Sequence, residues 1–238
     1  MPEGPETWRD ARRLDAALAG RPAQEVWFAF EHLEADANVL RGSPVGAVEA
    51  RGKAILVSFP EVERVIVTHN NLYGRWYLVD AGERPDTRRQ LRLLLENDRK
   101  AALLYSASDI RVLPADGLGD HPYLGRIGPD ALAPETTVAD LRQRLSDRRF
   151  SGRALGGLLL DQSFVAGLGN YLRSEILFEA GVHPDDRPKD LAPPLLDALA
   201  DALSAVPRRA LAERGRTVTD DLVAPDAKDP PKPGSRRP

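Results

Sequence analysis

The chain begins with MPEGPE at residues 1–6, and this stretch has the features of a helix start. Pro5 suits a first helical turn, where the N–H that proline lacks has no hydrogen-bond partner in any case. Glu3 and Glu6 bring negative charge to the positive end of the helix dipole. The stretch therefore predicts a helix over residues 2–19.

Short apolar segments separated by glycine and proline follow the predicted helix. Their length and their boundaries are typical of strands. The dipeptide Asn97-Asp98 is a turn signal, and it makes the last two segments a hairpin. About eight short strands at this spacing suggest a β-sandwich. Strands are expected at residues 26–30, 45–49, 54–59, 65–68, 75–79, 90–96 and 101–105.

Helical patterns replace the strand patterns near residue 130. Pro129 and Pro134 mark a linker, and Thr136 or Thr137 is expected to cap a helix that runs to Leu145. Apolar residues at spacings of three and four predict more helices. These helices are expected at residues 155–163, 171–180 and 195–206.

The sequence thus predicts an α+β protein in three parts. Residues 1–128 form a β-sandwich domain with an N-terminal helix, and residues 129–213 form a helical domain. Residues 214–238 contain five prolines and almost no apolar periodicity. We expect this last part to be a disordered tail.

The composition limits the class of protein. Hydrophobic residues make up 42% of the 238 residues, and no apolar run approaches the roughly 18 residues of a membrane span. The N-terminus lacks the basic and apolar stretches of a signal peptide. The absence of cysteine excludes disulfides and thiolate metal sites and favours a reducing cytoplasm. A net charge of −3 argues, taken alone, against a nucleic-acid binder.

One segment is basic in spite of the overall negative charge. Such a stripe can bind phosphates while the rest of the protein stays acidic. It can equally be a solvated, arginine-rich helix end, and the sequence leaves both readings open. The segment holds a single acid, Asp147, among Arg142, Arg144, Arg148, Arg149 and Arg153.

Four motifs, in order along the chain, resemble those of the formamidopyrimidine-DNA glycosylase/endonuclease VIII family. They are MPEGPE at 1–6, RGKA at 51–54, HNNLYG at 69–74, and LDQ at 160–162 followed by GLGNYL at 167–172. Residues 26–30 and 105–110 look closer to the endonuclease VIII branch. The resemblance covers roughly residues 1–216. It implies that residues 129–213 form a helix–two-turn–helix domain that binds DNA.

The resemblance implies that Pro2 is the catalytic nucleophile. Removal of the initiator methionine would leave Pro2 as a free secondary amine, and an α-amino group with a pKa of about 8 is partly neutral near pH 7. Attack on the sugar C1′ expels the base. The resulting iminium cannot lose a proton to become neutral, so it acts as an electron sink. We therefore expect a glycosylase with coupled β,δ-lyase activity, as the family has.

Three more residues are expected to serve this chemistry. Glu3 lies beside the nucleophile and can move protons at the sugar. Glu6 lies one helical turn further and assists, although both acids also complement the helix dipole. The resemblance implies that Lys53 contacts the phosphate by the lesion and acts at the ring oxygen.

The resemblance also implies a DNA-binding set. Asn71, Leu72 and Tyr73 would fill the space that a flipped base leaves, although the family has glutamine where Asn71 stands. The alternative is an ordinary loop with Leu72 and Tyr73 in the core. Gly169 and Asn170 open a helix whose N-terminus attracts phosphate, or Asn170 is simply an N-cap. Arg126 and Arg153 complete the predicted set.

The sequence departs from the family at its end. Typical members carry a four-cysteine zinc finger that presents an arginine to DNA, and this sequence has no cysteine. A truncated gene, a frameshift and a natural variant would each explain the difference. We expect no metal site and no cofactor.

Base-excision repair by a monomer is the leading interpretation. The expected substrate is damaged double-stranded DNA carrying oxidised pyrimidines, and the alternative within enzymology is a preference for oxidised purines. The protein is expected in the cytoplasm at the nucleoid, without contact to a membrane. The competing class is a damaged-DNA-binding protein that kept the scaffold and lost turnover together with the zinc finger.

Overall fold

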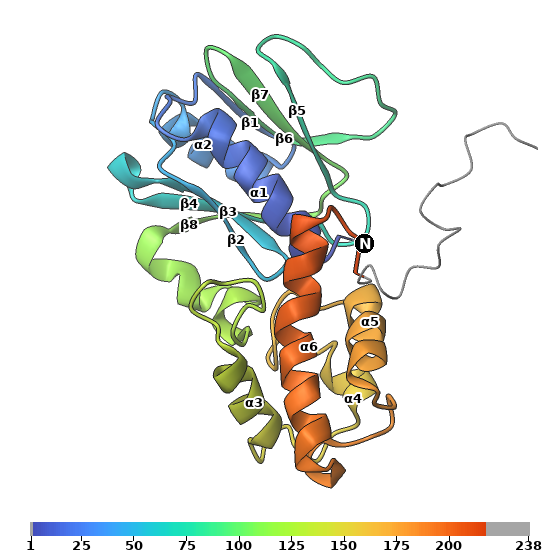
Figure 1. Ribbon diagram of the computed structural model, residues 1–238. Coiled ribbons are helices and arrows are strands. Elements are labelled where there is room, and N and C mark those ends of the chain that lie inside the picture. The colour runs from blue at the N-terminus through green and yellow to red at the C-terminus, as the bar shows by residue number, and fades with distance from the viewer. Residues whose placement is uncertain (1, 218–238) are drawn as a thin grey trace, which may run out of the picture.

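The computed structural model describes residues 2–217, in which a β-rich part is stacked on a helical part (Figure 1). The chain opens with helix α1 (Gly4–Leu18), whose first turn lies where the two parts meet. The predicted α+β class is confirmed. The predicted disordered tail lies outside the described residues from residue 218 onward.

Eight strands form two antiparallel sheets of four strands each. The first sheet has the order β1-β6-β7-β5, and the second has the order β2-β3-β4-β8. A short helix, α2 (Glu34–Leu40), follows β1. The strands are β1 (Glu25–Phe28), β2 (Val48–Arg51), β3 (Ala54–Phe59), β4 (Arg64–His69), β5 (Arg75–Asp80), β6 (Leu91–Glu96), β7 (Lys100–Tyr105) and β8 (Asp109–Pro114).

The core of the sandwich explains why some strands are apolar throughout. Ile55, Val57 and Phe59 of β3 face the main core, which α1 also enters. Ala54 and Leu56 point to the opposite face, where the segment after β8 covers them. A strand buried on both faces has no polar side. The sequence of β3 is therefore a nearly continuous apolar run.

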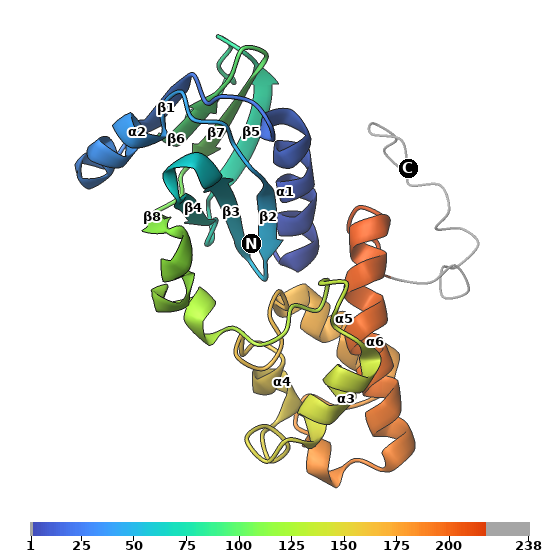
Figure 2. The ribbon, with the colours of Figure 1, turned by 90° about the vertical axis from the view of Figure 1, so that its left-hand side faces the viewer.

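The helical part has a core of its own, and Figure 2 shows its helices grouped below the sheets. Thr137 caps α3, because its hydroxyl accepts a hydrogen bond from the Asp140 N–H at 3.1 Å. Thr136, the other predicted cap, is buried. The helices are α3 (Val138–Ser146), α4 (Leu155–Leu158), α5 (Asn170–Ala180) and α6 (Pro193–Ala212).

The predicted helix over residues 155–163 is wrong in its second half. Helix α4 ends at Leu158. Beyond it, the Asp161 carboxylate accepts hydrogen bonds from both the N–H and the hydroxyl of Ser163, at 2.8 and 2.7 Å. An aspartate that binds backbone two residues ahead stabilises a turn in competition with a helix. The strand predicted at residues 45–49 is found a few residues further along the chain, as β2. Helix α2 and strand β8 were not predicted.

Asp130 joins the two parts of the molecule. Its carboxylate accepts hydrogen bonds from Trp8 Nε1 at 3.0 Å, from the Gly52 N–H at 2.7 Å and from the Leu132 N–H at 2.8 Å. These donors belong to α1, to the turn between β2 and β3, and to the segment that leads into the helical part. Burial raises the pKa of Asp130, since the three donors only partly offset the lost hydration.

We predict that Asp130→Ala lowers the free energy of unfolding by about 2–4 kcal/mol, because the substitution leaves three donors without an acceptor. Urea unfolding followed by circular dichroism measures the change. Asp116→Ala removes an exposed carboxylate and serves as the control, with an expected change within about 0.5 kcal/mol. Equal stability of the two variants would contradict the role of Asp130 as a clamp.

Candidate active site

The Glu3 carboxylate docks on the N-terminus of α5. Its Oε1 accepts a hydrogen bond from the Tyr171 N–H at 3.0 Å, and its Oε2 accepts one from the Leu172 N–H at 3.2 Å. Glu3 is only 3% exposed. Burial raises the pKa of Glu3, and this effect outweighs the backbone N–H groups and Lys53, which lower it. The side chain is therefore poised to exchange a proton nearer to neutral pH than an exposed glutamate.

Glu3 is also the N-cap of α1, where it forms a capping box with Glu6. The Glu3 N–H donates to Glu6 Oε2 at 3.0 Å. Glu6 accepts a hydrogen bond from the Tyr171 hydroxyl at 3.2 Å and forms an ion pair with Arg9 at 3.1 Å. Both predicted acids thus meet the start of α5. Tyr171 was not predicted as a site residue, and only a long-range contact identifies it.

Glycines permit this close approach. A Cβ atom at Gly169 would lie 2.2 Å from Cδ of Glu3, so no other residue fits there without a shift. The Gly4 N–H donates to the Gly167 carbonyl oxygen at 2.8 Å. The need for glycine at position 169 follows from the contact with Glu3, whether or not a phosphate also binds there.

Lys53 lies in the tight turn between β2 and β3. Gly52 precedes it with φ +60°, and the Lys53 N–H donates to the Tyr123 hydroxyl at 2.9 Å. The Lys53 side chain is 8% exposed. Burial lowers its pKa, while the nearby Glu3 carboxylate raises it. Lys53 is thus close enough to Glu3 for each to influence the pKa of the other. Burial shifts the pKa of both groups in the direction that favours the neutral form.

The loop between β4 and β5 presents its middle residues to solvent. The Gly74 N–H closes the loop on the Asn70 carbonyl oxygen at 2.7 Å. Asn71 adopts φ +48°, a left-handed conformation that asparagine tolerates better than most residues. Leu72 and Tyr73 are 57% and 66% exposed. The alternative that these two side chains belong to the core is therefore wrong.

Asn170 is the first residue of α5, and Gly169 occupies the N-cap position. The alternative reading of Asn170 as the N-cap is therefore wrong. Its side chain is exposed, and it makes no hydrogen bond to residues 2–217. The amide is free to meet a ligand at the same helix end that holds Glu3.

The arginine stripe at residues 142–153 is largely neutralised inside the protein. Arg144 donates to the carbonyl oxygens of Phe164 and Ser163 and lies over the Phe150 ring. Three of the other arginines form ion pairs, with N···O distances of 2.5–2.8 Å: Arg142 with Asp197, Arg149 with Asp147, and Arg153 with Asp161. The geometry thus favours a structural role for most of the stripe. Arg126, predicted to bind DNA, donates to the Pro122 carbonyl oxygen at 2.6 Å.

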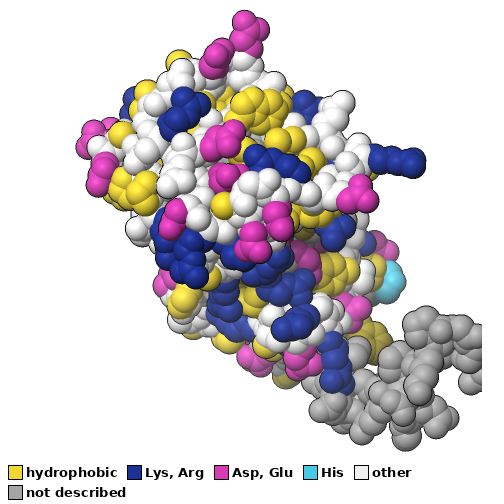
Figure 3. All heavy atoms as spheres, turned by 90° about the horizontal axis from the view of Figure 1, so that it is seen from above, with side chains coloured by type: hydrophobic (Ala, Val, Ile, Leu, Met, Phe, Trp, Pro, Cys, Tyr) yellow, Lys and Arg dark blue, Asp and Glu magenta, His cyan; other side chains and the backbone are white. Residues whose placement is uncertain are grey.

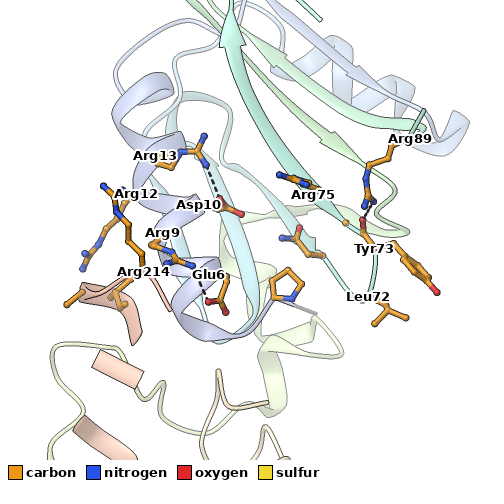
Figure 4. Close-up of a pocket in the computed structure, with 15 residues that line it drawn as sticks. Glu6, Arg9, Asp10, Arg12, Arg13, Leu72, Tyr73, Arg75, Arg89 and Arg214 are labelled. Carbon is orange, nitrogen blue, oxygen red and sulfur yellow. Dashed lines mark hydrogen bonds and ion pairs between the residues drawn. The ribbon is translucent and has the colours of Figure 1, made fainter. Parts of the chain in front are cut away.

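A groove of about 850 Å³ contains Pro2 and is basic. Figure 4 shows arginines of α1 on one side of it and Leu72, Tyr73 and Arg89 on the other. On the face seen in Figure 3, Lys and Arg side chains gather across the middle. The spacing of Arg9, Arg12 and Arg13 along α1 was the one sequence signal for this surface. The groove is lined by Arg9, Arg12, Arg13, Arg75, Arg89 and Arg214, against the acids Glu6 and Asp10.

Residues 2–217 contain no group of histidine, aspartate and glutamate side chains arranged to hold a metal ion. In the same part of the chain, no helix has the length and apolar character needed to cross a membrane.

Comparisons with known proteins agree with the motifs. The formamidopyrimidine-DNA glycosylase N-terminal domain matches residues 1–112, and the formamidopyrimidine-DNA glycosylase H2TH domain matches residues 127–221. Endonuclease 8 of Escherichia coli O7:K1 is 50% identical over 216 residues, which cover 91% of this chain and 82% of that protein. Endonuclease 8 of Shigella flexneri shows the same identity and coverage.

Solved structures share the fold at lower identity. The Lactococcus lactis Fpg protein in complex with abasic-site DNA has a TM-score of 0.76 and 19% identity, covering 91% of this chain and 81% of that chain. Its complex with DNA containing an oxidised pyrimidine has a TM-score of 0.77 and 20% identity, covering 90% and 82%. At this identity the likeness supports the fold alone.

The family suggested by the four motifs is thus confirmed by matches to both of its domains and by relatives of 50% identity. The chain belongs to the formamidopyrimidine-DNA glycosylase/endonuclease VIII family and is an endonuclease 8 homologue of the DNA glycosylase/AP lyase class, with no cysteine from which to build the family's zinc finger.

Proposed function

We propose that this protein excises oxidised bases, chiefly pyrimidines, from double-stranded DNA and cleaves the resulting abasic site, with the Pro2 amine as nucleophile. One observation carries the proposal. The Glu3 carboxylate bonds the start of α5, so the neighbourhood of Pro2 and Lys53 meets that of Asn170. The enzyme acts as a monomer on chromosomal DNA in the bacterial cytoplasm.

The chemistry begins once Met1 has been removed. The Pro2 nitrogen attacks C1′ with its lone pair, and the glycosidic bond breaks with its electrons on the departing base, which takes up a proton. The attached nitrogen, now cationic, gives up its own proton. Its lone pair then breaks the C1′–O4′ bond, O4′ is protonated and a cationic iminium forms. Loss of a 2′ hydrogen expels the 3′ phosphate, and a second elimination expels the 5′ phosphate. The iminium accepts the electron pair in each elimination.

Glu3 and Lys53 supply the proton transfers. A carboxyl group with a raised pKa can be protonated and donate to O4′, and its carboxylate can afterwards take the 2′ hydrogen. The Lys53 ammonium interacts electrostatically with Glu3 and stabilises negative charge that develops on oxygen. Glu6 holds the Glu3 N–H and thereby orients the residue next to the nucleophile.

The exposed loop residues fit a role in base eversion. An enzyme that acts on a base within a duplex must take that base out of the stack, and an inserted side chain offsets part of the unstacking cost. Leu72 and Tyr73 offer an apolar wedge and an aromatic ring.

A second candidate is a damaged-DNA-binding protein without turnover. The observation that favours it is that the 238 residues contain no cysteine, the residue that binds zinc in the family's finger. Against it, the buried Glu3 and Lys53 retain shifted pKa values, which a protein that only binds DNA does not need. The enzyme reading is therefore preferred.

Borohydride trapping tests the proposed function directly. We predict that the mature protein forms a covalent adduct with abasic-site DNA in the presence of borohydride. Retention of Met1 or an N-terminal tag should abolish the adduct, whereas Pro2→Gly should keep part of it, because a primary amine still forms an imine. Equal trapping by the tagged protein would assign the reaction to another nucleophile, for example Lys53.

The raised pKa of Glu3 predicts a pH dependence. The folded state holds the Glu3 proton to higher pH than the unfolded chain, so this group weakens stability as pH rises from 4.5 through its folded pKa. Glu3→Gln removes that titration. We therefore expect the variant to gain stability relative to wild type across this window. Its lyase rate should fall by about 10²–10⁴-fold.

The corresponding measurements are urea unfolding at several pH values and single-turnover cleavage of abasic-site DNA. Glu34→Gln, at an exposed position on α2, is the control and should keep the wild-type rate. A Glu3→Gln variant that cleaves as fast as wild type would remove Glu3 from the mechanism.

The basic groove predicts a salt dependence of DNA binding. If Arg12 and Arg75 each neutralise one phosphate, Arg12→Gln and Arg75→Gln each reduce the slope of log affinity against log salt by about 0.9. Fluorescence anisotropy across a salt series gives the slope. Arg99→Gln changes an exposed arginine in the turn between β6 and β7 and should leave the slope as it is. Identical slopes for all variants would place the DNA elsewhere.

A further inference from the structure

Asn70 has a buried side chain that the mechanism above does not use. It follows β4 directly and is 5% exposed. Its Oδ1 is buried and has no hydrogen-bond partner within residues 2–217. A buried amide that makes no hydrogen bond costs stability, and nearly all buried polar groups in proteins are paired. We therefore expect this amide to form a hydrogen bond with a group outside the chain.

The surroundings of Asn70 indicate where that partner lies. Asn70 lines the same groove as Pro2 and the exposed Leu72 and Tyr73. Its backbone is held firmly, because its carbonyl oxygen accepts the Gly74 N–H at 2.7 Å. A Cβ atom at Gly74 would lie 2.5 Å from that oxygen, so the turn is packed against Asn70. The backbone of Asn70 is thus fixed in the wall of the groove that also contains Pro2, Leu72 and Tyr73.

We propose that the Asn70 amide reads the everted base by hydrogen bonds to its Watson–Crick edge. The inference rests on the proposed function, because Pro2 can attack C1′ only when the everted nucleotide lies beside it. The base, bonded to C1′, must then lie in or next to the groove. The groove volume of about 850 Å³ leaves room for it.

Among the side chains that line the groove, Asn70 has the hydrogen-bonding groups that suit this role. An oxidised pyrimidine derived from thymine or uracil presents an N–H flanked by carbonyl oxygens. A side-chain amide offers an acceptor and a donor side by side and matches that pattern. The lining arginines are donors only, the carboxylates of Glu6 and Asp10 are acceptors when ionised, and Asn70 is the one amide among the lining residues. The substrate class is therefore a base with adjacent N–H and carbonyl groups.

Asn70→Leu tests the inference, since leucine has a similar size and no polar atoms. The substrates are duplex DNA with a single 5,6-dihydrothymine, a reduced thymine that keeps the N–H flanked by carbonyl oxygens, and the same duplex with an abasic site, both in single turnover. An abasic site has no base to read. We expect the ratio of base excision to abasic-site cleavage to fall at least tenfold in the variant. Its Tm should rise by about 2–4 °C, because an unpaired buried amide has been removed.

Equilibrium binding gives a second measurement that does not depend on turnover. Wild type should prefer dihydrothymine DNA to DNA with a tetrahydrofuran abasic analogue, and Asn70→Leu should lose that preference. Asn38→Ala, at an exposed position on α2, is the matched control and should keep both ratios.

Two outcomes would overturn the inference. Unchanged ratios in Asn70→Leu would show that the base is read elsewhere. A lowered Tm with a parallel loss of both activities would show that the amide supports the fold. Failure of the proposed function has a different signature, namely a wild-type protein that forms no borohydride adduct, and the binding ratios would still decide the role of Asn70.

Discussion

The contact between the Glu3 carboxylate and the first N–H groups of α5 is the interaction on which the site depends. The two hydrogen bonds join Glu3 to Tyr171 and Leu172, which lie 168 and 169 positions further along the chain. They fix the start of the chain against the helical part. The contact is so close that any side chain at position 169 would displace the Glu3 carboxylate. Asp130 forms a second clamp between the same two parts and also holds the turn that carries Lys53. Because two separate contacts hold α1, the helix has little freedom to rotate about either of them. Pro2 lies just before this helix, so its position is restricted as well.

Ion pairs and hydrogen bonds determine where free positive charge remains on this protein. Most of the arginines at residues 142–153 are bound to carbonyl oxygens or aspartates, so the most basic stretch of the sequence contributes little free charge. The groove beside Pro2 is lined by six arginines from α1, β5, the segment before β6 and the turn after α6, and by two acids. A local positive surface can therefore attract a polyanion although the whole chain carries a net charge of −3.

The sequence was informative wherever the signal was local. Periodicity identified β3 and α5 to within a residue, and the hexapeptide at residues 1–6 located the start of α1. Prediction failed where a distant contact decides the structure. Nothing near Tyr171 or Asp130 in the sequence shows that they hold the start of the chain. The groove arginines were missed because they come from four separate segments.

Four residues in or near the candidate site break the ordinary rules of stability. Glu3 and Lys53 are ionisable and buried, Asn71 has a left-handed backbone, and the Asn70 amide is unpaired. Each feature costs free energy in the isolated protein, and none is needed to close the cores of the two parts. Natural proteins tolerate such local conflicts mainly where function requires them. Their presence at the candidate site supports the proposal that the chemistry takes place beside Pro2.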